Sequence, residues 1–340
     1  MRTRHGKIYG LALALLGITW LPAHAENTPH ADAFLLLPVS AREVGLGQAT
    51  LPIVDDATAF HWNPAGIGMV ERFDATASYA RLYTDLANHQ MIAAATPIGY
   101  EDISVGVGWV KLGVDDIPRY PSLPQLERDR IRIAQAGAIG AFNYAQNAFF
   151  FTVARRSDFV FSMGWQYLEL PVTLALGSTV KYLTVSAGDS AAVEGSGIGL
   201  DLGAQVHFEL SRAIDNERLG RVSLGMTGVN VGGTKITWNT DTERSDMQSF
   251  GIGYGVAYTQ PIPEIRSAIT GTIADHAAGT VWGLEYTFAD LISLRAGSDI
   301  SDSSPTAFGI GLGWRGLHLD YGLQRHTLGA SHRVSVRYAL

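Results

Sequence analysis

Large apolar residues alternate with small or polar residues along most of the chain from about residue 73 onward. The clearest stretch is the C-terminal one, residues 333–340, with the sequence RVSVRYAL. In a β-strand, successive side chains point to opposite faces of the sheet. The alternation therefore predicts a series of strands, each with one apolar face and one small or polar face.

Turn and loop residues divide this region into fourteen expected strands. They are expected at 73–83, 88–98, 102–112, 145–156, 172–187, 195–210, 220–231, 247–260, 264–276, 278–289, 291–301, 305–314, 316–326 and 330–340. Between them, short turns near 99–101 and 261–263 alternate with long polar connections such as 113–144 and 232–246. Such alternation is typical of membrane barrels. The connection 157–171 is an exception, because it is long where a short turn is expected.

The two faces of these strands differ in a way that predicts where they lie. In residues 307–314 the large side chains are Phe308, Ile310, Leu312 and Trp314, and the positions between them hold only alanine and glycine. A soluble barrel needs bulky side chains to fill its interior. Large residues outside and small ones inside predict an all-β fold, a transmembrane antiparallel β-barrel of about 14 strands in contact with outer-membrane lipid. A soluble exported β-sandwich is the alternative class.

The first 25 residues predict a secretory signal peptide. Arg2, Arg4 and Lys7 precede the apolar run 8–21, and the tripeptide at 23–25 (AHA) has the small residues of a cleavage site. The apolar run is shorter than the roughly 20 residues that a membrane-spanning helix needs. We therefore expect export, with the outer membrane as the final location.

Charge and composition exclude several functional classes. The formal net charge is −7 for the whole chain and −10 without residues 1–25, which contain three basic residues and no acidic one. An acidic chain without basic blocks argues against nucleic-acid binding. The chain has no cysteine, so disulfides, thiolate catalysis and cysteine zinc sites are absent. No histidine spacing or nucleophile motif indicates catalysis, and we expect no enzyme, no metal and no cofactor.

Residues 26–72 lack the strand alternation but contain the motifs AREVGLGQA (41–49), DDATA (55–59) and WNPAG (62–66). The C-terminal third adds GLEY, LRAG, LDY and HRVS, at 283–286, 294–297, 319–321 and 332–335. Together these motifs resemble the PorV/PorQ family, within the wider FadL-like group of outer-membrane proteins. Gln48 stands where the family often has glycine, and the chain ends on Leu340, where outer-membrane barrels usually end on an aromatic residue.

The resemblance implies that 26–72 fold back into the barrel lumen as a plug, or hatch, and that 73–340 form the barrel. The residues of the plug motif are Arg42, Gly45, Gly47, Asp55, Asp56, Asn63, Pro64 and Gly66. The two glycines at 45 and 47 allow close backbone packing or positive φ, and Asn63-Pro64 favours a tight turn. The two aspartates either cap a helix or turn, or pair with arginines of the wall such as Arg295, Arg333 or Arg337.

The alternation also predicts which polar side chains point into the lumen. They are Lys181, Asp201, Gln205, His207, Glu285, Arg295, His318, Asp320, Arg333 and Arg337. Ions can pair across the interior of a plugged or water-filled barrel. These residues are expected to hold plug and wall together, or else to line a substrate path.

Two functions fit these expectations. The resemblance implies a non-enzymatic docking or shuttle component of type IX-like protein export, which receives secreted cargo proteins at its long loops. The alternative is a FadL-like channel for hydrophobic small molecules such as fatty acids, with an apolar pocket at Leu35, Leu36, Leu37, Phe60 and Trp62. The expected partners are outer-membrane lipid, the barrel-assembly machinery, and either secreted cargo or a hydrophobic small molecule.

Overall fold

A computed structural model describes residues 33–99, 102–119, 137–138, 140–162, 169–188, 193–213, 216, 218–239, 245–277, 279–300 and 306–340. The strands are β1 (Asp74–Leu82), β2 (Ala87–Ile98), β3 (Ile103–Arg119), β4 (Gly140–Ser162), β5 (Glu169–Ala187), β6 (Val193–Glu209), β7 (Arg221–Val229), β8 (Thr234–Trp238), β9 (Ser245–Gln248), β10 (Gly251–Ile262), β11 (Ser267–His276), β12 (Gly279–Phe288), β13 (Ile292–Asp299), β14 (Thr306–Trp314), β15 (Leu317–His326) and β16 (Gly329–Ala339). The helices are η1 (Ala33–Leu36), α2 (Ala41–Gly45), α3 (Ala59–Trp62), η2 (Pro64–Met69), α5 (Leu210–Ala213) and η3 (Pro263–Ile265). The predicted signal peptide, residues 1–25, lies outside the described residues.

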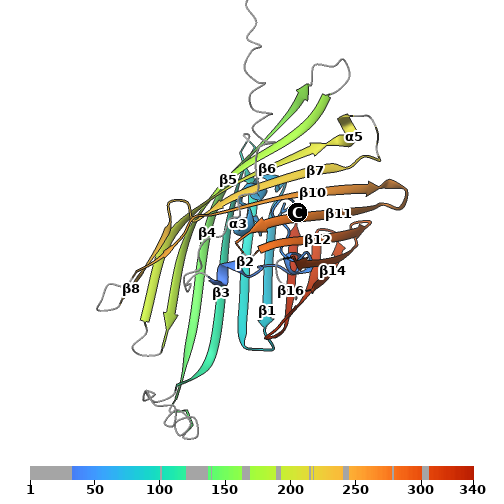
Figure 1. The fold of residues 1–340 in the computed structure, drawn as a ribbon. Coiled ribbons are helices and arrows are strands. Elements are labelled where there is room, and N and C mark those ends of the chain that lie inside the picture. The colour runs from blue at the N-terminus through green and yellow to red at the C-terminus, as the bar shows by residue number, and fades with distance from the viewer. Residues whose placement is uncertain are drawn as a thin grey trace, which may run out of the picture.

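Fourteen of these strands close into one antiparallel barrel, which confirms the predicted fold class (Figure 1). Each strand pairs with its neighbours in sequence, and β7 pairs with β6 and with β10. The barrel closes where β1 pairs with β16, from Asp74↔Ala339 to Arg81↔His332. The remaining strands, β8 and β9, form a hairpin that pairs with β6 beyond the end of β7. The expected loop at 232–246 therefore contains strand structure.

The two ends of the barrel differ, and we name them for use below. The turn end carries the beginning of β1 and the end of β16, and Leu340 donates a backbone hydrogen bond to the carbonyl of Phe73 there. The loop end carries the end of β3, the beginning of β4 and the β8–β9 hairpin. The expected long connection at 157–171 is wrong, because β4 and β5 stay paired as far as Ser162↔Glu169. That correction restores a short connection at the turn end.

The apolar rows of the strands face outward. Along β14, Phe308, Ile310, Leu312 and Trp314 are 48%, 44%, 52% and 66% exposed, and the glycines between them face the interior. Water would leave these rows without a partner, whereas a bilayer covers them. No second sheet packs over the rows in the described part of the chain, so the soluble β-sandwich is excluded. Among the described residues, no helix is long and apolar enough to cross a membrane.

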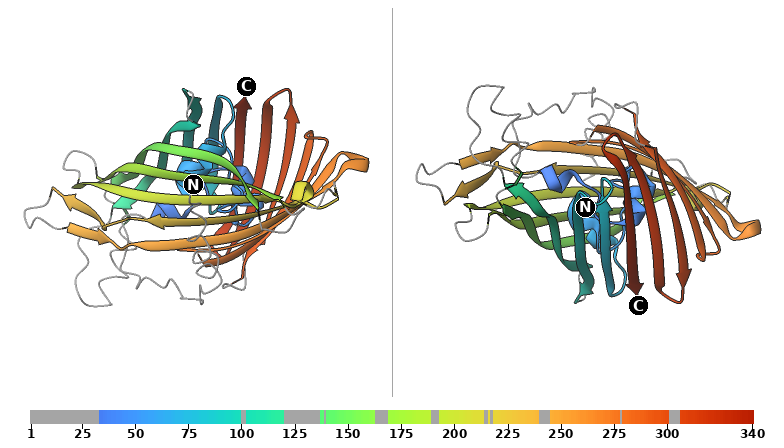
Figure 2. Two further views of the ribbon diagram at one scale, coloured as in Figure 1. Left: turned by 90° about the horizontal axis from the view of Figure 1, so that it is seen from above. Right: turned by 90° about the horizontal axis from the view of Figure 1, so that it is seen from below.

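Residues 33–73, which we call the inner segment, lie inside the barrel as far as Val70, and residues 71–73 are exposed (Figure 2). Its short helices begin where the sequence supplies caps. Ser40 accepts a hydrogen bond from the backbone N–H of Glu43, and the Glu43 carboxylate accepts one from the Ser40 N–H, which forms a capping box for α2. Asn63 accepts from the Ala65 N–H and Pro64 occupies the first turn of η2. Local sequence therefore sets the bends that let this segment follow the wall.

We predict that the outward face tolerates charge only outside the membrane. Replacing Ile310, at the middle of β14, with Arg should lower the free energy of unfolding by about 2–4 kcal/mol, because a guanidinium is placed among lipid tails. The matched control is Leu328→Arg, in the β15–β16 turn, where the change should stay within about 0.5 kcal/mol. Urea unfolding in lipid vesicles measures both. Equal effects of the two substitutions would contradict a lipid-facing β14.

Candidate functional site

The inner segment follows the inside of the wall, passing from β16 towards β3. Around α2 it contacts β14 and β15, where a Cβ on Gly322 would lie 2.8 Å from the Ala41 carbonyl oxygen and one on Gly309 would lie 2.9 Å from the Gly45 Cα. Real Cβ atoms almost never come this close to other atoms. The inward glycines thus let the backbone of the inner segment touch the backbone of the wall.

The same contact continues around the barrel. Thr272 on β11 donates its hydroxyl to the Ala49 carbonyl at 2.7 Å, and Gln205 on β6 donates its amide to the Pro52 carbonyl at 2.8 Å. Asn63 donates to the Ala204 carbonyl at 3.2 Å. The wall therefore satisfies backbone groups of a segment that has little regular structure of its own.

Gly45 and Gly47 occupy positions where glycine is needed. Gly45 meets Gly309 as described, and Gly47 has φ +59° and lies against Gly297 and Ser298. The next residue, Gln48, also has a positive φ of 73°. That backbone conformation is the one glycine adopts without strain, which gives a physical reason for the glycine often found there in the family that the motif resembles.

Charged side chains gather at the turn end of the lumen, in what we call the ionic cluster. Its members are Arg42, Asp55, Asp56, Asp74, Glu285, Arg295, Asp320 and Arg337. Arg42 joins the inner segment to the wall, because it contacts Asp55 at 2.9 Å and Glu285 of β12 at 3.4 Å. A cavity of about 210 Å³ lies among these groups.

Two arginines of the wall complete the ionic cluster. Arg295 holds Glu285 at 2.6 Å and also pairs with Asp320. Arg337 holds Asp74 at 2.6 Å and approaches Asp56 at 3.9 Å. A mostly buried ion pair adds little net stability, but removing one partner leaves a desolvated charge alone. The cluster thus makes any displacement of the inner segment costly.

The two aspartates of the motif fill both of the roles considered from sequence. Asp56 accepts the backbone N–H of Thr58 at 2.9 Å, as a turn-forming residue does. It also faces the wall arginine Arg337 at 3.9 Å, and Arg42 of the inner segment at 3.7 Å. The main ionic partner of Asp55 is Arg42, in the inner segment itself, and not one of the three wall arginines named from sequence.

Three predicted lumen residues, Arg333, Lys181 and Asp201, make contacts away from the ionic cluster. Arg333 is 2% exposed and donates to the Val39 carbonyl at 3.2 Å, and it contacts Nδ1 of His89 at 2.8 Å. Lys181 and Asp201 form a buried pair at 2.8 Å, and Asp201 also accepts the backbone N–H of Asn230. The Lys181–Asp201 pair, through its hydrogen bond with Asn230, fixes the bend between β7 and β8.

Two other predicted lumen residues line cavities. His318 lines the cavity among the ionic cluster, and His207 lines a larger cavity at the turn end. Gly66 packs so closely against Ala59 and Val54 that a Cβ at this position would overlap both residues. No group of three or more His, Asp or Glu side chains within the described ranges is arranged to hold a metal ion.

One side of the lumen is apolar from the loop end as far as Val70 and Ala95 near the turn end, and we call this group the apolar cluster. The inner segment contributes Phe34, Val39, Val54, Phe60 and Ile67, and the wall contributes Met91, Val110, Phe150, Leu183, Val185 and Ile236. The rings of Phe60 and Phe150 lie 4.6 Å apart, and Gly108 makes room for the Phe60 ring. Partly buried side chains form its rim, namely Leu35, Leu37, Leu112, Tyr144 and Trp238.

The residues expected to line an apolar pocket fall into different environments. Phe60 is fully buried in the apolar cluster, and Leu35 lies on its rim. Trp62 packs on His276 with ring centres 4.5 Å apart and donates to the Glu43 carboxylate at 3.3 Å. Leu36 is partly buried and belongs neither to the apolar cluster nor to its rim. None of these four residues lines the cavity among the ionic cluster or the larger cavity at the turn end.

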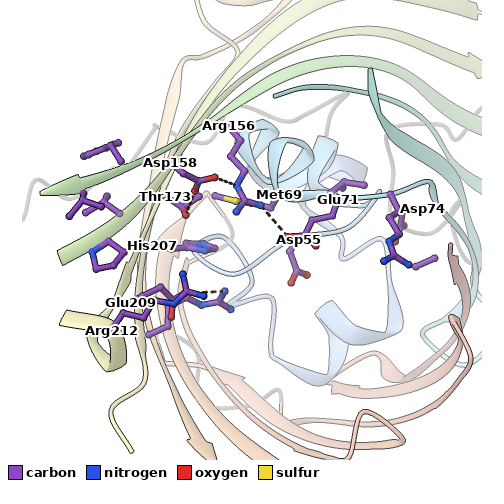
Figure 3. Close-up of a pocket in the computed structure, with 18 of the residues that line it drawn as sticks. Asp55, Met69, Glu71, Asp74, Arg156, Asp158, Thr173, His207, Glu209 and Arg212 are labelled. Carbon is purple, nitrogen blue, oxygen red and sulfur yellow. Dashed lines mark hydrogen bonds and ion pairs between the residues drawn. The ribbon is translucent and has the colours of Figure 1, made fainter. Parts of the chain in front are cut away.

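A larger cavity of about 950 Å³, which we call the vestibule, opens at the turn end (Figure 3). Arg156 reaches into it and pairs with Asp158 at 3.0 Å and with Glu71 at 3.2 Å. Across the vestibule, Arg221 approaches Glu209 at 3.9 Å. The vestibule therefore carries charged groups, which the apolar cluster lacks, although apolar side chains such as Phe159 and Val172 also line it. About 45 Å of β4 separates Tyr144 on the rim from Asp158.

No protein-family model matches the sequence, and a search of curated proteins finds no match. Among solved structures, the Ralstonia pickettii toluene transporter TbuX is similar over 89% of this chain and 98% of its own, with 12% identity and a TM-score of 0.48. The P. putida toluene transporter TodX is similar over 90% and 99%, with 11% identity and a TM-score of 0.48. A Pseudomonas aeruginosa FadL homologue covers 89% and 99%, with 10% identity and a TM-score of 0.46.

We predict that Arg42 fastens the inner segment. Arg42→Ala removes the guanidinium from the buried Glu285 and from Asp55, and should lower the free energy of unfolding by about 2 kcal/mol, below the range for fully buried pairs because the Asp55 side chain is 43% exposed. The control is Arg81→Ala on β1, whose exposed pair with Asp85 at 3.5 Å should contribute less than about 1 kcal/mol. Urea unfolding and protease cleavage within residues 33–73 report the effect. Equal losses in the two variants would show that Arg42 does not fasten the segment.

Proposed function

We propose that the protein is an outer-membrane channel for the uptake of small hydrophobic molecules, and that the inner segment is its plug. The observation that carries this proposal is the apolar cluster inside the lumen, with its partly buried rim at the loop end. A water-filled pore has a polar interior. An apolar rim inside a membrane barrel instead favours molecules that leave water for a greasy surface.

The direction of uptake follows from the asymmetry of the barrel. In outer-membrane barrels the long loops face the cell exterior and the short turns face the periplasm. The rim at Leu37, Leu112 and Trp238 would therefore meet molecules arriving from outside. The vestibule would face the periplasm, where its wide opening, lined in part by charged groups, would allow the molecule to leave.

The inner segment closes the path between these two regions. Phe60 and Ile67 fill the apolar cluster from the inside, and Arg42 ties the same segment to the ionic cluster. Uptake then needs a local rearrangement of side chains or of part of the segment. Local opening costs less than unfolding the whole chain, so the plug can yield while the barrel stays closed.

A second function, docking of secreted proteins in type IX-like export, is favoured by the motifs at both ends of the chain. The extended strands β3–β6 and the β8–β9 hairpin would offer a protein-sized surface at the loop end. Affinity purification of the protein from its native outer membrane tests this role. Recovery of exported cargo proteins would support it, and recovery of the barrel alone would count against it.

We predict that the rim binds apolar molecules. Replacing Leu37 and Leu112 together with Asn should weaken binding of the fluorescent probe N-phenyl-1-naphthylamine about tenfold, which corresponds to about 1.4 kcal/mol. That loss is smaller than the value for burying two leucines fully, because both are only partly buried. Fluorescence titration of the protein in detergent measures the affinity.

The control is Val160→Asn, which makes the same kind of change at the vestibule, where Val160 is 57% exposed. The affinity of this variant should match that of the unsubstituted protein. Loss of binding in Val160→Asn, with binding retained in the Leu37 and Leu112 variant, would place the ligand at the wrong end of the barrel and reject the proposal.

A further inference from the structure

The barrel closes by joining the two strands that lie furthest apart in the sequence. β1 begins at Asp74 and β16 ends at Ala339, and these two residues are paired in the closed barrel. The other pairs of the barrel join strands that follow one another, with the β8–β9 hairpin as an insertion between β7 and β10. Bringing such distant strands together is slow because chain entropy opposes it. This junction, which we call the seam, is the hardest contact of the fold to form.

The inner segment touches both sides of the seam. On the β16 side, the backbone N–H of Ala41 donates to the Ser335 hydroxyl at 2.8 Å. On the β1 side, the N–H of Ala57 donates to the Asp74 carboxylate at 3.1 Å. Because the inner segment directly precedes β1 in the chain, its docking on β14–β16 brings β1 close to its last partner.

Arg333 ties these parts together at one point. It belongs to β16, yet its guanidinium lies within hydrogen-bond distance of the Ser78 hydroxyl on β1, at 3.4 Å, and of His89 on β2, at 2.8 Å. It also donates to the Val39 carbonyl of the inner segment at 3.2 Å. No carboxylate among the described residues lies within ion-pairing distance of this buried cation. Its hydrogen-bond partners lie on β1, on the neighbouring strand β2 and in the inner segment.

We propose that the inner segment is a template for barrel assembly, on which the seam closes, and that Arg333 is the positioning residue of this step. The segment docks on the glycine face of β14 and β15 while the barrel is open, and it thereby holds β16 in register for β1. This role is separate from transport and does not depend on it. A plug that enters a finished barrel predicts the opposite order of events.

The absence of cysteine from the chain allows both events to be timed with engineered disulfides. Ala41→Cys with Ser335→Cys reports docking of the inner segment, because these residues are in contact. Ala77→Cys with Val336→Cys reports closure of the seam, because these residues are paired across it. Each full-length variant is folded from urea into lipid vesicles, oxidised and quenched at successive times, and resolved by gel migration. The template predicts that docking forms no later than the seam.

A wall substitution then separates the two models. Gly309→Val blocks docking, because its side chain would meet the Gly45 backbone, but it lies three strands away from β1 and Val suits a strand. The template predicts seam closure at least tenfold slower. The matched control is Gly271→Val on β11, where an added Cβ meets nothing within 4 Å, and its rate should not change. Seam closure at the unsubstituted rate in Gly309→Val would overturn the proposal.

Two further variants guard against a defect of the wall itself. Deletion of residues 33–70 removes the template without touching any strand, and it should slow seam closure as much as Gly309→Val does. Arg333→Gln should slow the seam while Arg81→Gln, an exposed arginine on the same seam, should not. A deletion variant that closes its seam at the unsubstituted rate would show that the inner segment enters late and is no template.

Discussion

The structure depends on direct contact between two backbones, that of the inner segment and that of the barrel wall. Glycines at Gly309 and Gly322 permit the contact, because a side chain there would overlap the backbone of residues 41–45. Hydrogen bonds from Thr272 and Gln205 then satisfy the carbonyl groups that this approach buries. Small inward residues and large outward residues are thus two sides of one arrangement, in which the wall binds lipid outside and its own N-terminal chain inside.

The same arrangement divides the lumen into two chemically different halves. At the turn end, Arg42 of the inner segment pairs with Glu285 of the wall, Arg337 of the wall approaches Asp56 of the inner segment, and charged groups line part of the vestibule beyond them. At the loop end, Phe60 and Phe150 belong to an apolar cluster whose rim is partly exposed. In the proposed uptake role, a hydrophobic molecule would gain free energy by leaving water at the rim. The inner segment would then separate an apolar entrance from an exit that carries charged groups.

Much of the fold could be predicted from sequence, because period-two alternation is a direct consequence of strand geometry. The fourteen barrel strands and the closed all-β class follow from it. The length of β4 does not, because Phe159, Val160 and Phe161 are apolar on both faces and hide the alternation. The ionic cluster could be predicted only in part. Inward positions such as Glu285 and Arg295 follow from periodicity, but the pairing of Asp55 with Arg42 depends on how the inner segment bends, which no local pattern determines.

The central claim is that the apolar rim inside the loop end is the binding site of a hydrophobic molecule. The most direct test is a crystal structure of the protein grown with a brominated aromatic compound, whose bromine is located by anomalous scattering. The account predicts a bromine peak within contact distance of Leu37, Leu112 or Trp238. Bromine peaks found only on the outer, lipid-facing surface or in the vestibule would contradict it.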